Sequence, residues 1–88
     1  MAVELSGKIA LITGGGQGVG QGVALAMAGA GASLVLFGRT LAKLEVTAAM
    51  ITERGGKALT VAGDVASADD LGAAVQAAVD GFGGVDIL

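Results

Sequence analysis

Four short apolar runs recur along the chain, each bounded by glycines or polar residues. They cover residues 8–13 (KIALIT), 33–37 (SLVLF), 57–62 (KALTVA) and 85–88 (VDIL). Short runs that are apolar throughout and partly β-branched are typical of parallel strands buried on both faces of a sheet. We therefore predict four strands in one sheet, the fourth only begun where the sequence stops.

Between these runs the apolar positions recur with the period of a helix. The clearest stripe follows an i, i+3, i+4, i+7 spacing and consists of Leu71, Ala74, Val75, Ala78, Val79 and Phe82. Ser67, followed three residues later by Asp70, predicts a capping box at the start of this helix. Gly81, Gly83 and Gly84 predict its end.

Two further helices are predicted, over residues 41–54 and 19–30. In the first, Thr40 is the expected N-cap, the pair Gly55-Gly56 is the expected stop, and Lys43 and Thr47 are expected on the outer side. Its inner side is predicted to consist of Leu41, Leu44, Ala48 and Ile51. The helix over 19–30 is rich in small residues, so it can approach the sheet closely.

The resulting order, β-α-β-α-β-α-β, predicts parallel pairing through right-handed crossovers. We expect an α/β fold of the Rossmann type, a doubly wound parallel sheet with strand order 3-2-1-4, left incomplete. Residues 1–88 would form the N-terminal nucleotide-binding part of one domain, truncated in strand four. An apolar strand at the end leaves an unpaired edge, so we interpret the chain as a portion of a longer protein rather than a naturally short one.

Composition excludes several kinds of function. The chain has no cysteine and no histidine, so we expect no metal site, no disulfide and no triad chemistry. The net charge is −3 and no run of lysine or arginine occurs, which argues against a nucleic-acid partner. The apolar stretch 9–12 is too short for a signal peptide or a membrane span, so we expect a cytoplasmic protein without a membrane partner.

The most informative segment is the glycine-rich loop TGGGQGVG over residues 13–20, which follows the first strand and opens a helix. Glycine permits positive φ and lets a diphosphate approach, while the helix start offers free amides and a partial positive charge. The spacing Gly15 to Gly20 fits a P-loop, but Gln21 and Gly22 follow where lysine and a hydroxyl residue are needed. An ordinary glycine-rich turn remains the alternative to an anion site.

The loop matches T-G-x-x-x-G-x-G, and the chain resembles the short-chain dehydrogenases/reductases. The likeness extends from Leu5-x-Gly7-Lys8 through this loop to Asp64-Val65 and to Asp86-Ile87-Leu88. The resemblance implies a nicotinamide dinucleotide cofactor, with Asp64 accepting a hydrogen bond from the adenine amino group and Val65 contacting the ring. It also implies that Gln17 helps to hold a 2′-phosphate. The loop residues implied to bind cofactor are Gly14, Gly16, Gln17, Gly18, Val19 and Gly20.

Gly38 and Arg39 follow the second strand, where an NAD site usually has an acid for the ribose hydroxyls. A glycine leaves room there, and the adjacent guanidinium can bind phosphate in bidentate fashion. We therefore predict NADP(H) as the cofactor, with NAD as the alternative. Two other interpretations stay open: Arg39 as a solvated residue beside Thr40, and Asp64 as a turn or capping residue.

No catalytic residue is predicted in the chain itself. The resembled family uses a tyrosine, a lysine, a serine and an asparagine, and this sequence has no tyrosine and no asparagine. The parent would transfer hydride between NADP(H) and a small carbonyl or alcohol substrate, and would be a homo-oligomer. One alternative is a non-catalytic module that assembles through its open strand edge. Another is a methyltransferase that binds S-adenosylmethionine. Gly38-Arg39 disfavours it, because the ribose of S-adenosylmethionine also needs an acid at the end of the second strand.

Overall fold

The computed structural model describes residues 5–14 and 18–86, in which three strands alternate with three helices. In chain order the elements are β1 (Ile9–Thr13), α1 (Gly18–Gly29), β2 (Ser33–Gly38), α2 (Leu41–Glu53), β3 (Lys57–Ala62) and α3 (Ala68–Phe82). These bounds agree with the prediction to within one residue. No helix in the two described ranges is long and apolar enough to cross a membrane.

The three strands form one parallel sheet with β2 in the centre. Ser33 of β2 pairs with Ile9 of β1 on one side and with Lys57 of β3 on the other. The order β1-β2-β3 is the predicted 3-2-1 counted from the opposite edge. The fold class is therefore confirmed.

The start of the predicted fourth strand differs from the expectation. Val85 and Asp86 form no strand, and residues 87–88 lie outside the described part. The N–H of Asp86 donates to the Ile9 carbonyl oxygen at 2.8 Å, while its carboxylate accepts from the Ile9 N–H at 2.9 Å. Because the Asp86 side chain takes the Ile9 N–H that a strand carbonyl would bind, the hydrogen bonds of residues 85–86 to β1 are confined to Ile9 and form no ladder.

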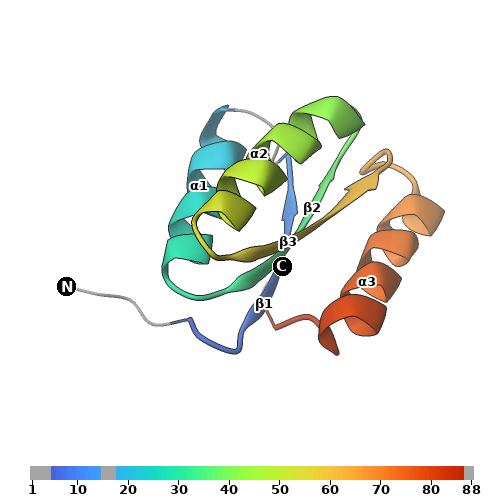
Figure 1. Cartoon of the computed structure of the whole chain (residues 1–88). Helices are drawn as coiled ribbons and strands as arrows, with labels where there is room; N and C mark the ends of the chain where they lie inside the picture. Colours follow the sequence, from blue (N-terminus) through green and yellow to red (C-terminus); the bar gives the residue numbers. More distant parts are fainter. Residues whose placement is uncertain (1–4, 15–17, 87–88) are drawn as a thin grey trace.

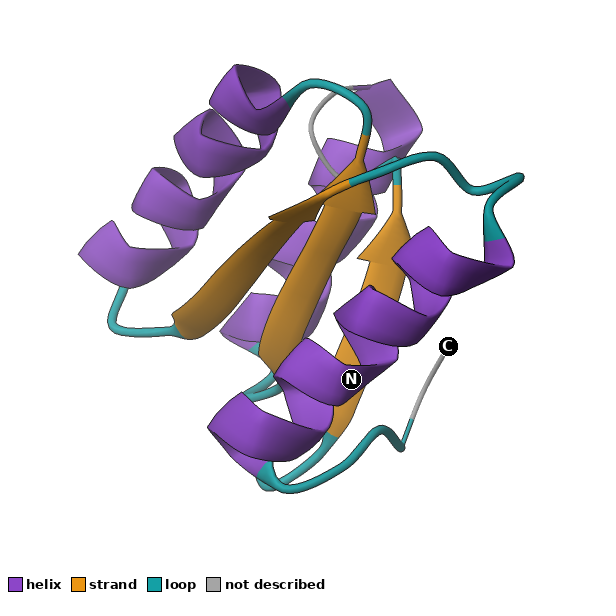
Figure 2. Cartoon of the chain, turned by 90° about the vertical axis from the view of Figure 1, so that its right-hand side faces the viewer, coloured by secondary structure: helices purple, strands orange, loops and turns teal. Residues whose placement is uncertain are grey.

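Helices cover both faces of the sheet. Helices α1 and α2 lie on one face and α3 lies on the other, as Figures 1 and 2 show. On the central strand, Leu34 and Leu36 belong to the core under α1 and α2, whereas Val35 and Phe37 belong to the core under α3. This alternation follows from the two-residue period of a strand, and it gives a core that is aliphatic apart from Phe37 and the half-buried Phe82.

Strand β3 is less buried than its sequence predicts. All of the apolar side chains of β2 are buried, but in β3 Lys57, Leu59 and Ala62 are exposed. Among the described residues β3 pairs only with β2, so it is an edge strand with one side open. The apolar run alone does not distinguish a central strand from an edge strand.

The buried faces of two helices also differ from the predicted stripes. Thr47 of α2 is fully buried and Leu41 is 42% exposed, the reverse of the expectation. Thr47 faces α1, where the side-chain amide of Gln21 donates to its hydroxyl oxygen at 3.1 Å, so the buried hydroxyl has a partner. In α3, Ala74 and Ala78 form the buried centre of the stripe, while its flank, residues 75 and 79, is partly exposed.

At the start of α3, one of the two hydrogen bonds of the predicted capping box is present and the other is not. The Ser67 hydroxyl accepts from the Asp70 N–H at 3.2 Å, as a capping box requires. The Asp70 carboxylate, however, accepts from the Asp64 N–H at 2.9 Å instead of from the N–H of Ser67, which donates to the Asp64 carbonyl oxygen. Thr40 occupies the N-cap position of α2 but its side chain makes no capping hydrogen bond.

Candidate cofactor site

The segments that follow the three strands are joined at one edge of the sheet. The N–H of Gly14, after β1, donates to the Phe37 carbonyl oxygen at 2.9 Å, and the N–H of Gly63, after β3, donates to the Gly38 carbonyl oxygen at 2.8 Å. These bonds align the carboxyl ends of all three strands. Ligands of open α/β sheets bind outside this edge, and the predicted site residues lie along it.

The described part of the glycine-rich loop has the backbone that the prediction requires. Gly14 has φ of +70° and Gly18 has φ of +59°, both in the left-handed region that side chains disfavour. At neither glycine does any described atom lie within 4 Å of the position that a Cβ would take, so the space beside the loop is open. Gly16 and Gln17, also predicted to bind cofactor, lie outside the described residues.

The start of α1 differs from the start of α3 in its charge. The first four N–H groups of any helix lack an intrahelical acceptor, and α1 has no acidic residue in its first turn. By contrast, α3 carries Asp69 and Asp70 in its first turn and the Ser67 cap before it. In α3 the Ser67 hydroxyl accepts from the Asp70 N–H. At the start of α1, Val19 is 85% exposed and Gly20 is half-buried.

The residue in the place of a P-loop lysine points elsewhere. The Nε2 atom of Gln21 donates to Thr47 Oγ1 and lies 3.7 Å from Met50 Sδ, both on α2. This side chain is partly buried and ties α1 to α2, so it does not reach a phosphate in front of the loop.

Two predicted site residues contact each other. The Nη2 atom of Arg39, after β2, lies 3.3 Å from Oδ1 of Asp64, after β3, and the two side chains are 76% and 46% exposed. The sequence pattern did not predict this pair. The parallel register sets Gly38 opposite Ala62, so Arg39 after β2 and Asp64 two residues after β3 come close together.

Asp64 is held in place by more than this ion pair. Its Oδ1 accepts from the Ala66 N–H at 2.9 Å, and its own N–H donates to the Asp70 carboxylate. The hydrogen bond from Ala66, and after it the one from Arg39, lower the pKa of the Asp64 carboxyl below its ordinary value. Asp64 is therefore ionised at neutral pH, and its pKa lies below that of an ordinary aspartate, so it is protonated only at a lower pH.

The other two predicted residues flank this pair. A Cβ on Gly38 would lie 3.3 Å from Leu44 Cδ2, so glycine at this position also serves the packing of α2. Val65, next to Asp64, is 53% exposed and presents an apolar surface at the same edge. Gly38 and Val65 therefore both lie at the loop edge. Neither residue makes a contact that indicates which ligand it would bind.

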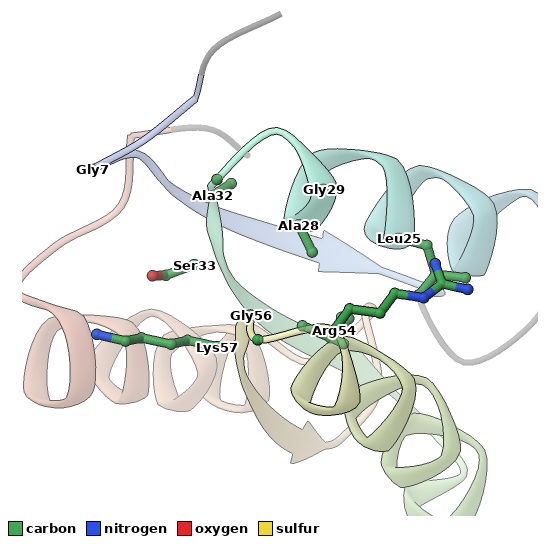
Figure 3. Close-up of a pocket in the computed structure, with 12 residues that line it drawn as sticks. Gly7, Leu25, Ala28, Gly29, Ala32, Ser33, Arg54, Gly56 and Lys57 are labelled. Carbon is green, nitrogen blue, oxygen red and sulfur yellow. The ribbon is translucent and has the colours of Figure 1, made fainter.

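A hollow of about 400 Å³ lies at the opposite end of the sheet, beside the turns that follow α1 and α2. Its lining contains two cationic residues, Arg54 and Lys57, whose side chains extend to different sides (Figure 3). None of the predicted cofactor residues lines it. The predicted cofactor residues lie at the loop edge and not at this hollow.

Comparison with known proteins identifies the family of this chain. The family described as short chain dehydrogenase matches residues 8–88. The chain belongs to this family. A short-chain dehydrogenase/reductase homolog of Bacillus subtilis, YusS, is 39% identical over 82 residues, which are 92% of this chain and 75% of that protein.

Solved structures of other short-chain dehydrogenases share the fold closely. L-Sorbose reductase from Gluconobacter frateurii, complexed with NADPH and L-sorbose, is 37% identical with a TM-score of 0.92 over 99% of this chain and 34% of that one. A metagenomic short-chain oxidoreductase in complex with NADP is 32% identical with a TM-score of 0.88 over 96% of this chain and 38% of that one. The chain thus spans about a third of these structures.

Membership of the family makes a nicotinamide dinucleotide the cofactor class to test against the residues present. The described part of the site fits the adenosine and diphosphate half of such a cofactor. It combines left-handed glycines with open space beside them, a helix start without its own acid, and a guanidinium and a carboxylate at the next two strand ends. Because the chain belongs to the short-chain dehydrogenase family, we no longer retain the methyltransferase interpretation.

Proposed function

We propose that this chain is the NADP(H)-binding portion of a short-chain oxidoreductase whose complete form transfers hydride between NADP(H) and a carbonyl or alcohol substrate. The observation that carries the proposal is the position of Arg39. Its guanidinium lies at the loop edge, exposed, directly after a strand that ends in Gly38 rather than in an acid. A guanidinium at this position favours a 2′-phosphate, which only NADP(H) carries.

Different residues would bind different parts of the cofactor. Main-chain amides from Gly14 to Gly20, Gly16 and Gln17 included, would bind the diphosphate, since a helix start favours anions. Asp64 would accept from the adenine amino group, because its Oδ2 makes no hydrogen bond among the described residues. Val65 would pack against the ring with its exposed side chain.

A second feature supports a phosphate beside Arg39. Helix α2 begins at Leu41 with no acidic residue in its first turn and without a side-chain cap from Thr40. Its first amides and the Thr40 hydroxyl are therefore available next to the guanidinium. Hydrogen bonds from charged and neutral donors together would hold a phosphate more firmly than Arg39 alone.

The bound dinucleotide supplies the hydride, and this chain's residues would bind and orient its adenosine end. The sequence has no tyrosine and no asparagine, so the groups that assist hydride transfer in this family do not come from this chain. The NADPH and NADP complexes of the two similar structures support the choice of cofactor. The parent's substrate would be a small carbonyl or alcohol.

Direct titration tests the proposal. We expect isothermal titration of the 88-residue chain to show binding of NADPH, with much weaker binding of NADH at the same chain concentration. Isothermal titration follows binding at the adenosine end, which is the half of the cofactor that this chain's residues would hold. Equal responses to NADH and NADPH would contradict the cofactor preference, and no response to either would contradict nucleotide binding.

A second candidate function is assembly through an open strand edge. In β1, the bonds of Lys8 and Gly14 to β2 show that even-numbered residues face β2, so the backbone groups of Leu11 and Thr13 face the other edge. Among the described residues only Asp86 reaches that edge, at Ile9. Such an edge can accept a strand from another polypeptide. A monodisperse monomer at all concentrations would count against this candidate.

For the parent protein we also propose a cytoplasmic location and a homo-oligomeric state, without a nucleic-acid partner. The absence of cysteine and the acidic net charge of −3 support the first and the last of these. The family resemblance supports the homo-oligomeric state.

A further inference from the structure

Arg39 and Asp64 are in contact, although the proposed function gives them different roles. Arg39 would bind the 2′-phosphate, and Asp64 would bind the adenine amino group. A single guanidinium nitrogen meets a single carboxylate oxygen at 3.3 Å, and both side chains are substantially exposed. If Arg39 is to bind a 2′-phosphate, the phosphate must take the place of this carboxylate or share the guanidinium with it. The inference that follows rests on the proposed cofactor site.

The two partners are held very differently. Asp64 is fixed by the Ala66 N–H on its carboxylate, by the Asp70 carboxylate on its own N–H, and by the Ser67 N–H on its carbonyl oxygen. Arg39 has Asp64 as its side-chain partner among the described residues. A bound phosphate can therefore move the Arg39 guanidinium, whereas the Asp64 carboxylate keeps its position.

Charge then decides the effect of Asp64 on the cofactor. An isolated Arg39 would present one positive charge to the dianionic 2′-phosphate. With Asp64 beside it the pair is neutral overall, and the fixed carboxylate also repels the phosphate. A ribose 2′-hydroxyl carries no charge, so the same carboxylate does not penalise a cofactor that lacks the phosphate.

We propose that Asp64 is a specificity-setting residue, which limits the preference for a 2′-phosphorylated adenosine by competing with the phosphate for the Arg39 guanidinium. Asp64 thus has two separable effects. Its contact with the adenine amino group acts equally on both forms of the cofactor, whereas the competition acts only on the phosphorylated one.

The test uses adenosine 2′,5′-bisphosphate and adenosine 5′-monophosphate, because these probes differ only in the 2′-phosphate. We expect Asp64→Asn, which keeps an oxygen acceptor for the Ala66 N–H, to raise the ratio of the two affinities in favour of the bisphosphate. The expected rise is about two- to fivefold, the range of an exposed ion pair, and should shrink in high salt. Isothermal titration of the 88-residue chain measures both affinities.

Two further variants make the result specific. Asp80→Asn removes the same charge from the far end of α3, where Asp80 pairs with Gln76, and should leave the ratio unchanged. Placed in an Arg39→Ala background, Asp64→Asn should change the ratio much less, because the competition needs the guanidinium. If Asp64→Asn does not fold, Asp64→Ser, which also retains an acceptor for Ala66, replaces it.

Three outcomes would overturn the proposal. An unchanged ratio in Asp64→Asn, or an equal loss of both probes, would leave Asp64 with an adenine or structural role only. The same rise in the Arg39→Ala background would show simple repulsion without competition. Absence of binding of either probe to the unaltered chain would contradict the cofactor site itself, a result distinct from normal binding with an unchanged ratio.

Discussion

Arg39→Ala is expected to weaken NADPH binding by about 1.5–3 kcal/mol, roughly tenfold to a hundredfold, and to leave NADH binding nearly unchanged. The guanidinium would donate hydrogen bonds to the 2′-phosphate, and NADH has no such group. Arg39 is 76% exposed, so its removal takes nothing from the core. Isothermal titration of both cofactors gives the two affinities.

Arg54→Ala is the matched control for this prediction. It removes the same charge at the opposite end of the sheet, where Arg54 lines the hollow beside α2. We expect it to change the affinity for neither cofactor beyond a small effect of net charge. Equal losses of NADPH and NADH in Arg39→Ala would assign Arg39 a general role in folding or adenine binding instead.

Gly63→Ala is expected to destabilise the chain by about 1–3 kcal/mol, the range for overpacking a core. A Cβ at this position would lie 2.7 Å from Phe37 Cε1, 2.8 Å from Phe37 Cζ and 2.9 Å from Asp70 Cβ. The Phe37 ring is fully buried and cannot withdraw, and Asp70 holds the Asp64 N–H. The variant should therefore disturb both the core and the site, as a lower urea midpoint and weaker NADPH binding.

Gly72→Ala, the same substitution at another position, is expected to raise the stability of the chain rather than lower it. Gly72 lies in the exposed part of α3, and a Cβ there would meet nothing within 4 Å. Because alanine restricts the unfolded chain and favours a helix, this variant should be more stable by about 0.5–1 kcal/mol. A Gly63→Ala variant as stable as the original chain would show that the close packing around Phe37 is not as the structure has it.

Local pattern was sufficient for most of the fold. The apolar runs around Leu11 and Val35 and the stripe through Ala74 and Ala78 predicted the strands and α3, because period and length distinguish these elements without tertiary information. The glycine spacing placed the loop between β1 and α1, since few side chains tolerate positive φ at Gly14 and Gly18.

What the sequence did not predict depends on which elements become neighbours. The Arg39–Asp64 contact needs the parallel register of β2 and β3, and the burial of Thr47 needs Gln21 of α1 to lie beside α2. The exposure of Leu59 follows from the edge position of β3. Each of these features is a property of two elements together, which the periodicity of one segment does not contain.

We propose that main-chain amides between Gly14 and Gly20 bind the cofactor diphosphate. Amide chemical shifts of the ¹⁵N-labelled chain, followed while NADPH is added, show which amides sense the cofactor. We expect saturable shifts at Gly14, Gly18 and Gly20, with further shifts at Arg39 and Asp64. Unmoved loop amides, with the shifts confined to the hollow lined by residues 54–57, would contradict it.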